Sequence, residues 1–418
     1  MPANRRTHVA YDPQQLTFSG RINALIALGR IPLASEVPLW TTFGCILAAR
    51  LFPSTGAKGI TSIDWWVVFQ CAFTTWATNV SINYGNEFFD WNLDRPGQIE
   101  AIKRSVKARK EVVEDDKDDT QKEEEIQEFN EKIMGNTTRI IHDGTFPPYT
   151  ALILGLAWQA AVVGLIFYSR SKDPSVSYTT GTSHGSPYRG FALQVGIISS
   201  VLSQMYVGPP IRLHYHGFGE LISALLLNPV AILFGMTGYY TATTGHSVHI
   251  SDLFTTSKSG FSLGYLWVLL GAMYCFEQAR IFIMHIQDIE ADIAGGKITF
   301  VVRVGHAVAA RLYVAFNLAA LLLFRVFTRL YHTHGLKANH PQSFSRGWIQ
   351  GITAVMLYSI PIMIITAKSL FANIPPARVS KPTSGFLPSL PLTALPMLVS
   401  LQVLLSPIVL TIFTLIHW

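Results

Sequence analysis

The sequence predicts an all-α protein, a multi-pass transmembrane helical bundle of about nine spans, from three observations. Of the 418 residues, 49% are hydrophobic and only 14% are charged, and the mean hydropathy is positive, which soluble proteins of this length rarely show. Apolar stretches of roughly 17 to 25 residues, the length that spans a bilayer, recur along the chain. Two acidic strings, residues 86–94 and residues 288–292, each follow the end of such a stretch.

The predicted spans follow one another with short polar connections. In chain order they cover residues 31–52, 65–83, 149–168, 191–206, 221–240, 263–286, 307–327, 348–370 and 392–418. We expect them to form a single membrane domain over residues 31–418, preceded by a cytoplasmic N-terminal segment at residues 1–30.

One long connection differs in composition from the others. Residues 98–136 alternate basic and acidic runs and contain few large apolar side chains. This composition predicts a charged cytoplasmic insertion, solvated and partly helical or disordered. A lid over the first acidic string and a partner-docking segment are the alternatives.

Basic residues predict the orientation of the spans. Arg21 and Arg30 precede the first span, and residues 95–139 are rich in Lys and Arg, whereas Arg325 and Arg329 run against the rule. Because basic loops stay cytoplasmic, we expect a cytoplasmic N-terminus and both acidic strings at cytoplasmic span ends. The net charge of +6 then reflects topology, and no nucleic-acid partner is expected.

The acidic strings have the spacing of a metal site. Asn86, Asp90 and Asp94 in NEFFDWNLD are one helical turn apart, and Asp288 and Asp292 in DIEAD repeat that spacing, so each set lies on one helix face. Oxygen side chains suit Mg2+, which often shares its coordination shell with phosphate. The alternative is two solvated helix ends whose acids pair with nearby Lys and Arg.

Four basic residues strengthen the phosphate interpretation. Lys297 and Arg303 follow the second string in GGKITFVVRVG, Arg139 lies in TTRIIHDG, and Arg212 follows a Gly-Pro-Pro turn. Together with Mg2+, such cations neutralise a diphosphate and its charge as a leaving group. Each of them alone is also explained as a basic residue of a cytoplasmic loop.

Three other features bear on the spans. Arg280, placed inside the sixth span by hydropathy, needs a carboxylate partner such as Glu277 or a route to the interface. His285, one turn before Asp288, is either a base or ligand or a hydrogen-bonded packing residue. The cysteines, all in predicted spans, have no metal or redox spacing and are expected to pack: Cys45, Cys71 and Cys275.

These motifs resemble a known family. NEFFDWNLD resembles the first aspartate-rich motif of the UbiA superfamily of intramembrane prenyltransferases, and QDIEADIAGGKITFVVRVG resembles the second. MYVGPPIRLHYHGFGE and IMGNTTRIIHDGTFPP resemble segments of its dihydroxynaphthoate prenyltransferase branch. The resemblance covers about residues 31–303 and then fades to hydropathy.

The resemblance implies a UbiA-like fold with helices around a cavity open toward lipid, two Mg2+ ions and an isoprenyl diphosphate at the cytoplasmic cap. It implies one metal side at Asn86, Asp90 and Asp94 and another at Asp288 and Asp292. It further implies diphosphate contacts from Arg212, Lys297 and Arg139, with Tyr206 and Arg303 near the cap.

The sequence also departs from the family pattern. Glu87 stands where the family has Asp, and it could reach a metal or support one indirectly. His214 and His216 lie at positions where relatives differ among themselves. The long insertion and the lack of an evident organelle address in the N-terminal residues predict an endomembrane enzyme, for example of the endoplasmic reticulum.

Three functions remain open from the sequence. The first is Mg2+-dependent ionisation of an isoprenyl diphosphate, farnesyl or longer, and transfer of the prenyl cation to an aromatic or quinone-precursor acceptor. The second is a UbiA-type membrane terpene cyclase that converts farnesyl diphosphate to a sesquiterpene hydrocarbon. The third is a cation carrier or membrane scaffold, but a carrier places its ionisable residues near the bilayer midplane, and these strings lie at span ends.

Overall fold

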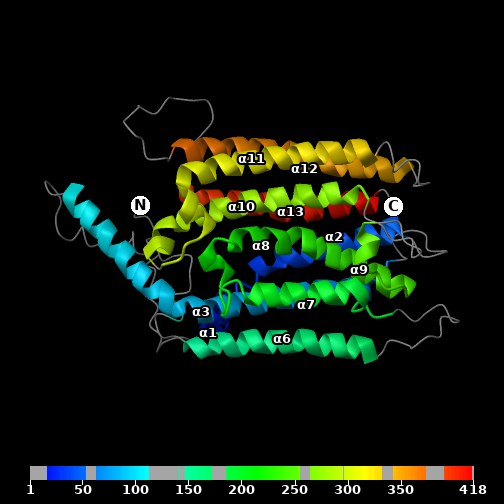
Figure 1. The fold of residues 1–418 in the computed structure, drawn as a ribbon, viewed down its shortest axis with the longest axis horizontal. Helices are drawn as coiled ribbons and strands as arrows, with labels where there is room; N and C mark the ends of the chain where they lie inside the picture. The colour runs from blue at the N-terminus through cyan, green and yellow to red at the C-terminus, as the bar shows by residue number, and fades with distance from the viewer. Residues whose placement is uncertain are drawn as a thin grey trace, which may run out of the picture.

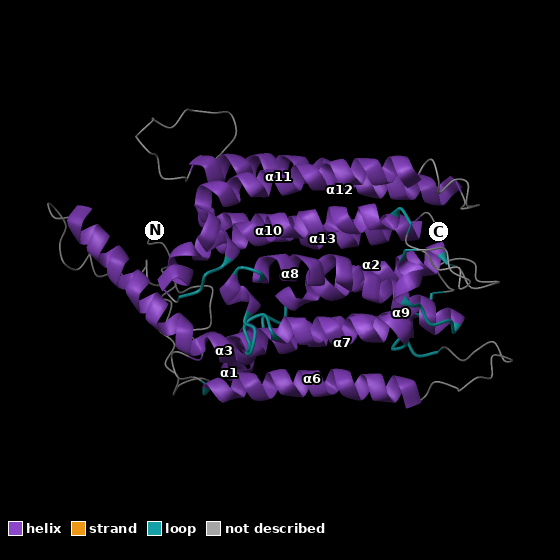
Figure 2. Ribbon diagram, viewed as in Figure 1, coloured by secondary structure: helices purple, strands orange, loops and turns teal. Residues whose placement is uncertain are grey.

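The fold is all-helical, as predicted. The computed structural model describes residues 17–52, 63–112, 141, 146–171, 185–254, 264–294, 296–331, 342–372 and 390–416, and within these ranges no strand occurs. The long helices lie side by side with their axes nearly parallel (Figures 1 and 2). This is the arrangement of a helical bundle, whose spans satisfy their backbone groups within each helix, as a bilayer requires.

Each predicted span coincides with a helical segment of the described chain. The α-helices are α1 (Phe18–Leu28), α2 (Glu36–Leu51), α3 (Trp65–Val112), α6 (Pro148–Ser171), α7 (Gly190–Gln204), α8 (Gly219–Leu225), α9 (Ala231–Thr244), α10 (Leu266–Ala294), α11 (Phe300–Leu330), α12 (Gln342–Ala372) and α13 (Leu395–Ile416). Short helical turns are η1 (Leu33–Ser35), η3 (Leu213–His216), η4 (Leu226–Val230), η5 (Ile250–Leu253) and η8 (Leu392–Ala394).

Six helices of the described chain are long and apolar enough to cross a membrane. They are α6, the continuous run Gly219–Thr244, Leu266–Ile289 of α10, α11, Gly347–Ala372 of α12, and α13. The outer helix α6 shows why a bilayer is needed, because Leu156 and Phe167 are 61% and 71% exposed. Apolar surface of this kind along a whole helix is typical of contact with lipid.

Two helices depart from the predicted boundaries. The second span was predicted to end at residue 83, but α3 continues without a break through the first acidic string to Val112, so the start of the charged insertion is helical. The seventh span was predicted to start at residue 307, and α11 has a non-helical Gly305, with φ of 75°, just before that point. Residues 113–136 of the insertion lie outside the described residues.

Small residues bring α2 and α9 into close contact. A Cβ atom added at Gly44 would lie 2.2 Å from the Ile232 carbonyl oxygen, and one added at Gly235 would lie 2.2 Å from that of Thr41. Glycines on both helices therefore allow backbone-to-backbone packing, a common device in membrane bundles. The Cys45 thiol donates to the Gly235 carbonyl over 3.4 Å, which agrees with the predicted packing role of this cysteine.

A charged cluster is buried between α2, η4 and α10. Arg280 Nε donates to Glu277 Oε2 over 3.0 Å, and its Nη2 lies 3.3 Å from Glu36 Oε2. Asn228 Nδ2 donates to Glu277 over 3.2 Å. Glu277 and Asn228 are fully buried. The expected carboxylate partner of Arg280 is thus confirmed, and Glu36 is a second one.

Replacing Arg280 by methionine is expected to destabilise the fold by about 3–5 kcal/mol, because two buried carboxylates would lose their cation. Thermal unfolding in detergent measures this loss. The matched control is Arg325→Met on the exposed side of α11, which should leave the unfolding temperature within a degree or two. Equal unfolding temperatures for the two variants would show that the buried pairs contribute nothing.

Candidate functional site

Three segments that are distant in sequence meet at one end of the bundle: the middle of α3, the turn η3, and the connection between α10 and α11 (Figure 1). Asp90 of α3 lies at their junction. Its Oδ1 accepts a hydrogen bond from the Tyr215 hydroxyl over 2.6 Å, and its Oδ2 accepts from Lys297 Nζ over 2.9 Å. The Asp90 and Lys297 side chains are 14% and 9% exposed, so this ion pair is largely shielded from water.

Two cations flank the ring of Tyr215. Lys297 Nζ lies 5.7 Å from the ring centroid, and the Arg212 guanidinium carbon lies 5.8 Å from it. Both distances are within the range of cation–π attraction. Arg212 has the left-handed φ of 48° just before η3, and Gly217 closes the turn with φ of 77°. Asp90, Tyr215, Lys297 and Arg212 thus lie together at one place, which we call the acidic corner.

The second acidic string reaches the same corner through Lys297. The Lys297 backbone N–H donates to the Asp292 carbonyl over 2.8 Å, while its side chain holds Asp90. A single residue therefore connects both acidic strings. The Thr299 hydroxyl lies 3.5 Å from Asp292 Oδ2 and caps α11 by accepting from the Val302 N–H over 3.2 Å.

A buried carboxylate secures the start of α11. Glu220, at the beginning of α8, is fully buried and accepts from the Val301 N–H over 3.2 Å. An acid at a helix N-terminus complements the partial positive charge of the unpaired N–H groups. Glu220 thus fixes the connection that carries Lys297 against the segment that carries Tyr215.

A group of histidines lies beside this corner. One potential ligand atom from each of His214, His285 and Asp292 lies within 4.8 Å of the other two. His214 is buried, and its ring packs on Tyr206 with centroids 4.8 Å apart. Burial lowers the pKa of the His214 imidazole well below its ordinary value, and His285 and Lys297 lower it further. His214 is therefore neutral at pH 7.

The other predicted oxygen ligands lie in different environments. Asn86 is half-buried on α3, one turn before Asp90, and Asp288 is exposed on α10. Glu87 is buried and pairs with Arg30 over 3.1 Å, an arrangement that holds α3 to the segment after α1. The side chain of Asp94 lies outside the described part of the chain.

The predicted basic residues also differ in position. Lys297 and Arg212 meet at Tyr215, as described above. The Arg303 guanidinium donates to the carbonyls of His216 and Ile298 over 3.1 and 3.4 Å, so it joins two connections. Arg139 lies outside the described residues.

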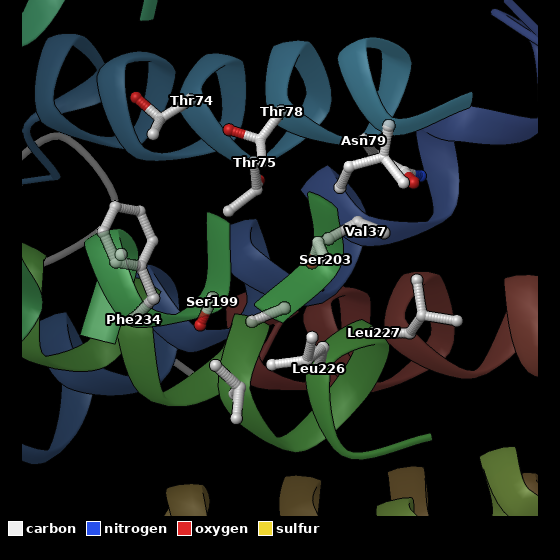
Figure 3. Close-up of a pocket in the computed structure, with 14 residues that line it drawn as sticks. Val37, Thr74, Thr75, Thr78, Asn79, Ser199, Ser203, Leu226, Leu227 and Phe234 are labelled. Carbon is white, nitrogen blue, oxygen red and sulfur yellow. The ribbon is translucent and has the colours of Figure 1, made fainter. Parts of the chain in front are cut away.

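A pocket opens between α2, α3, α7, η4 and α9 (Figure 3). Its cavity volume is about 80 Å3, and it is partly open to the surface. On α3, its lining residues Asn79 and Ile82 are two turns and one turn before Asn86, on a face shared with it. The remaining lining residues are Val37, Thr74, Thr75, Thr78, Gly196, Ser199, Ser203, Leu226, Leu227, Val230, Ala231 and Phe234.

Irregular helical structure shapes one wall of this pocket. Leu226, Leu227 and Val230 belong to η4, a π-helical turn that contains Pro229. Proline removes a backbone donor and favours such an irregularity, and π-turns often occur at functional sites. The wall is mostly apolar with a few hydroxyl groups, as suits a ligand with a hydrocarbon chain.

Sequence reasoning missed two residues of the site. Tyr215, the hydroxyl donor to Asp90, and His214, the neighbour of His285 and Asp292, were not assigned roles. The available signal was their position in LHYHGFGE immediately after Arg212. Their partners are distant in sequence, so spacing alone could not pair them.

Comparisons with known proteins give structural similarity only. No family model matches the chain, and no curated protein sequence matches it. The structure is similar to that of digeranylgeranylglyceryl phosphate synthase, with 12% identity, a TM-score of 0.48, and 95% of this chain and 98% of that chain covered. It is also similar to a UbiA homologue from Archaeoglobus fulgidus bound to GPP and Mg2+, with 12% identity, a TM-score of 0.46, and 93% and 99% covered.

Proposed function

We propose that this chain is a UbiA-superfamily membrane enzyme that ionises an isoprenyl diphosphate and transfers the prenyl cation to an aromatic or quinone-precursor acceptor. The observation that carries the proposal is the corner where Lys297 connects Asp90 to the backbone of Asp292, about two helical turns along α3 from a mainly apolar pocket. Polar groups for a diphosphate and an apolar chamber for its chain thus adjoin each other.

The donor set at the corner fits Mg2+. Asp90, with Asn86 one turn before it on α3, offers the oxygen ligands that this ion prefers, and Asp288 of the second string is proposed to join them. The Asp90 oxygens accept hydrogen bonds from Tyr215 and Lys297, which fix the orientation of this carboxylate. Asp94 would complete the predicted set. When bound, Mg2+ supplies neutralisation of the diphosphate charge.

The chain's own residues then have distinct tasks. Lys297 and Arg212 bind diphosphate oxygens through charge-assisted hydrogen bonds, and Tyr215 holds Lys297 in position by its ring and Asp90 by its hydroxyl. The pocket receives the prenyl chain and keeps water away from the carbocation that remains when diphosphate leaves. Arg139 is proposed to join the same group of cations.

The proposed location is a multi-pass integral membrane protein of the endoplasmic reticulum or another endomembrane. Arg30 pairs with Glu87 of α3, and Lys297 and Arg303 contact Asp90 and His216, so these basic residues lie at the end of the bundle that carries the site. The helix α1, which includes Arg21, lies near this end in Figure 1. By the positive-inside rule this end is cytoplasmic, and the N-terminus with it.

The decisive experiment separates the two chemistries. Membranes that contain the protein are incubated with farnesyl diphosphate and Mg2+, with and without dihydroxynaphthoate, and extracts are analysed for prenylated aromatics and hydrocarbons. We expect a prenylated aromatic that requires the acceptor. A hydrocarbon formed without acceptor would establish the terpene cyclase instead, because the chain's own double bond would then capture the cation. No consumption of diphosphate substrate would refute both.

A further inference from the structure

The group of His214, His285 and Asp292 has the composition of a transition-metal site. His285 and Asp292 are seven residues apart on α10, so they lie two turns apart on nearly the same face. His214 comes from η3, across the connection that follows α7. The three potential ligand atoms lie within 4.8 Å of one another.

The histidine nitrogens have unused bonding capacity. Nδ1 of His214 and Nδ1 of His285 are both buried, and neither has a hydrogen-bond partner in the described part of the chain. His214 is 5% exposed and Asp292 is 6% exposed. A buried polar atom without a partner is destabilising, so a ligand that binds these nitrogens would recover the lost interaction.

The local backbone holds His214 at this place. Its N–H donates to the Tyr206 carbonyl over 2.8 Å. A Cβ atom added at Gly219 would lie 2.7 Å from the Cα and 2.9 Å from Nδ1 of His214. Only glycine leaves room for the imidazole there, so its position is determined by its neighbours.

We infer that His214, His285 and Asp292 form a binding site for one divalent transition-metal ion of the zinc, cobalt or iron class. Two imidazoles and one carboxylate are a ligand set typical of these ions, with a further position left for water or a phosphate oxygen. Ligands at about 2.0–2.2 Å from a tetrahedral ion are roughly 3.4 Å apart. The three potential ligand atoms, now up to 4.8 Å apart, would therefore move toward one another by little more than an ångström.

This site differs from the proposed Mg2+ site in chemistry. Mg2+ prefers oxygen ligands, whereas two nitrogens favour borderline transition metals. Asp292, predicted from the sequence to bind Mg2+, here joins a nitrogen-rich set. The inference does not depend on the proposed reaction, because it concerns only which metal the chain binds.

Titration with Co2+ tests the site. Purified protein in detergent is stripped with a chelator and titrated with Co2+ in the presence of a large excess of Mg2+. We expect one equivalent of Co2+ to bind, with the intense visible absorption of a four- or five-coordinate ion that aqueous Co2+ lacks. His214→Ala, His285→Ala and Asp292→Asn should each weaken binding by at least tenfold.

The matched control is His216→Ala, an exposed histidine of the same turn, which should bind Co2+ as the wild type does. The unfolding temperature without metal shows which variants are folded, and Asp292→Asn creates no cavity. Complete displacement of Co2+ by Mg2+, unchanged binding in the folded variants, or no Co2+ binding by the wild type would overturn the inference. The last result would mean that the three residues only pack against one another.

Discussion

Replacing Asp90 by alanine is expected to lower the rate of farnesyl diphosphate consumption on the order of 1000-fold. The change removes the acceptor of both the Lys297 ammonium and the Tyr215 hydroxyl, so the cations that should face the diphosphate lose their fixed positions. Loss of a preorganised electrostatic contact in an active site costs about two to three orders of magnitude, and loss of a metal ligand adds to this. Product formation in isolated membranes measures the effect.

The control for Asp90 lies just before the first residue of the same helix. Asp64 caps the start of α3, where its Oδ1 accepts from the backbone N–H groups of Trp66 and Val67 over 3.0 and 3.2 Å. Asp64→Asn retains an oxygen acceptor and should keep activity within about threefold, with a small loss of stability. If Asp90→Ala turned over at a near-normal rate, the assignment of the corner to chemistry would be wrong.

Replacing Lys297 by methionine is expected to lower kcat/KM for the diphosphate substrate about 100-fold, because the variant loses a charge-assisted contact with phosphate. Lys297→Arg keeps the positive charge and should recover part of the loss. The measurement is steady-state kinetics with both variants at several diphosphate concentrations.

The fold of Lys297→Met should survive, since methionine fills a similar volume and the backbone hydrogen bond to Asp292 remains. Its unfolding temperature should nevertheless be lower than that of the wild type, because the shielded Asp90 loses its cation, whereas Lys297→Arg keeps that cation. Equal kcat/KM values for Lys297→Met and the wild type would show that Lys297 only neutralises Asp90.

The sequence was informative wherever the relevant pattern was local. Hydropathy located every predicted span within a helix, because twenty apolar residues in a row leave the chain few alternatives. The break at Gly305 falls close to the predicted start of the seventh span. Asp90 and Asp292 were predicted as metal ligands from a local pattern too, because a four-residue spacing of carboxylates on one helix face depends on helix geometry alone.

The sequence was less informative about contacts between distant segments. Glu87 pairs with Arg30, 57 residues earlier, and Asp90 pairs with a tyrosine and a lysine more than a hundred residues later. Helix packing determines such partners, and a spacing rule contains no information on it. For the same reason, the three-way meeting of His214, His285 and Asp292 became visible only in the folded chain.

Helix length was the other weak point. The apolar part of α3 ends near the first acidic string, and a hydropathy criterion stops there, but the helix runs on to Val112. Charged residues with good helix propensity continue a helix once it has been nucleated. Hydropathy therefore measures the thickness of the membrane more closely than the length of the helix.

The contact between Glu220 and the Val301 N–H has a consequence for assembly. The site draws on Asp90, Tyr215 and Lys297, and Glu220 makes the position of Lys297 depend on the segment that supplies Tyr215. No fragment shorter than residues 90–297 can contain all three side chains, so a nascent chain that stops before Lys297 would lack the proposed site.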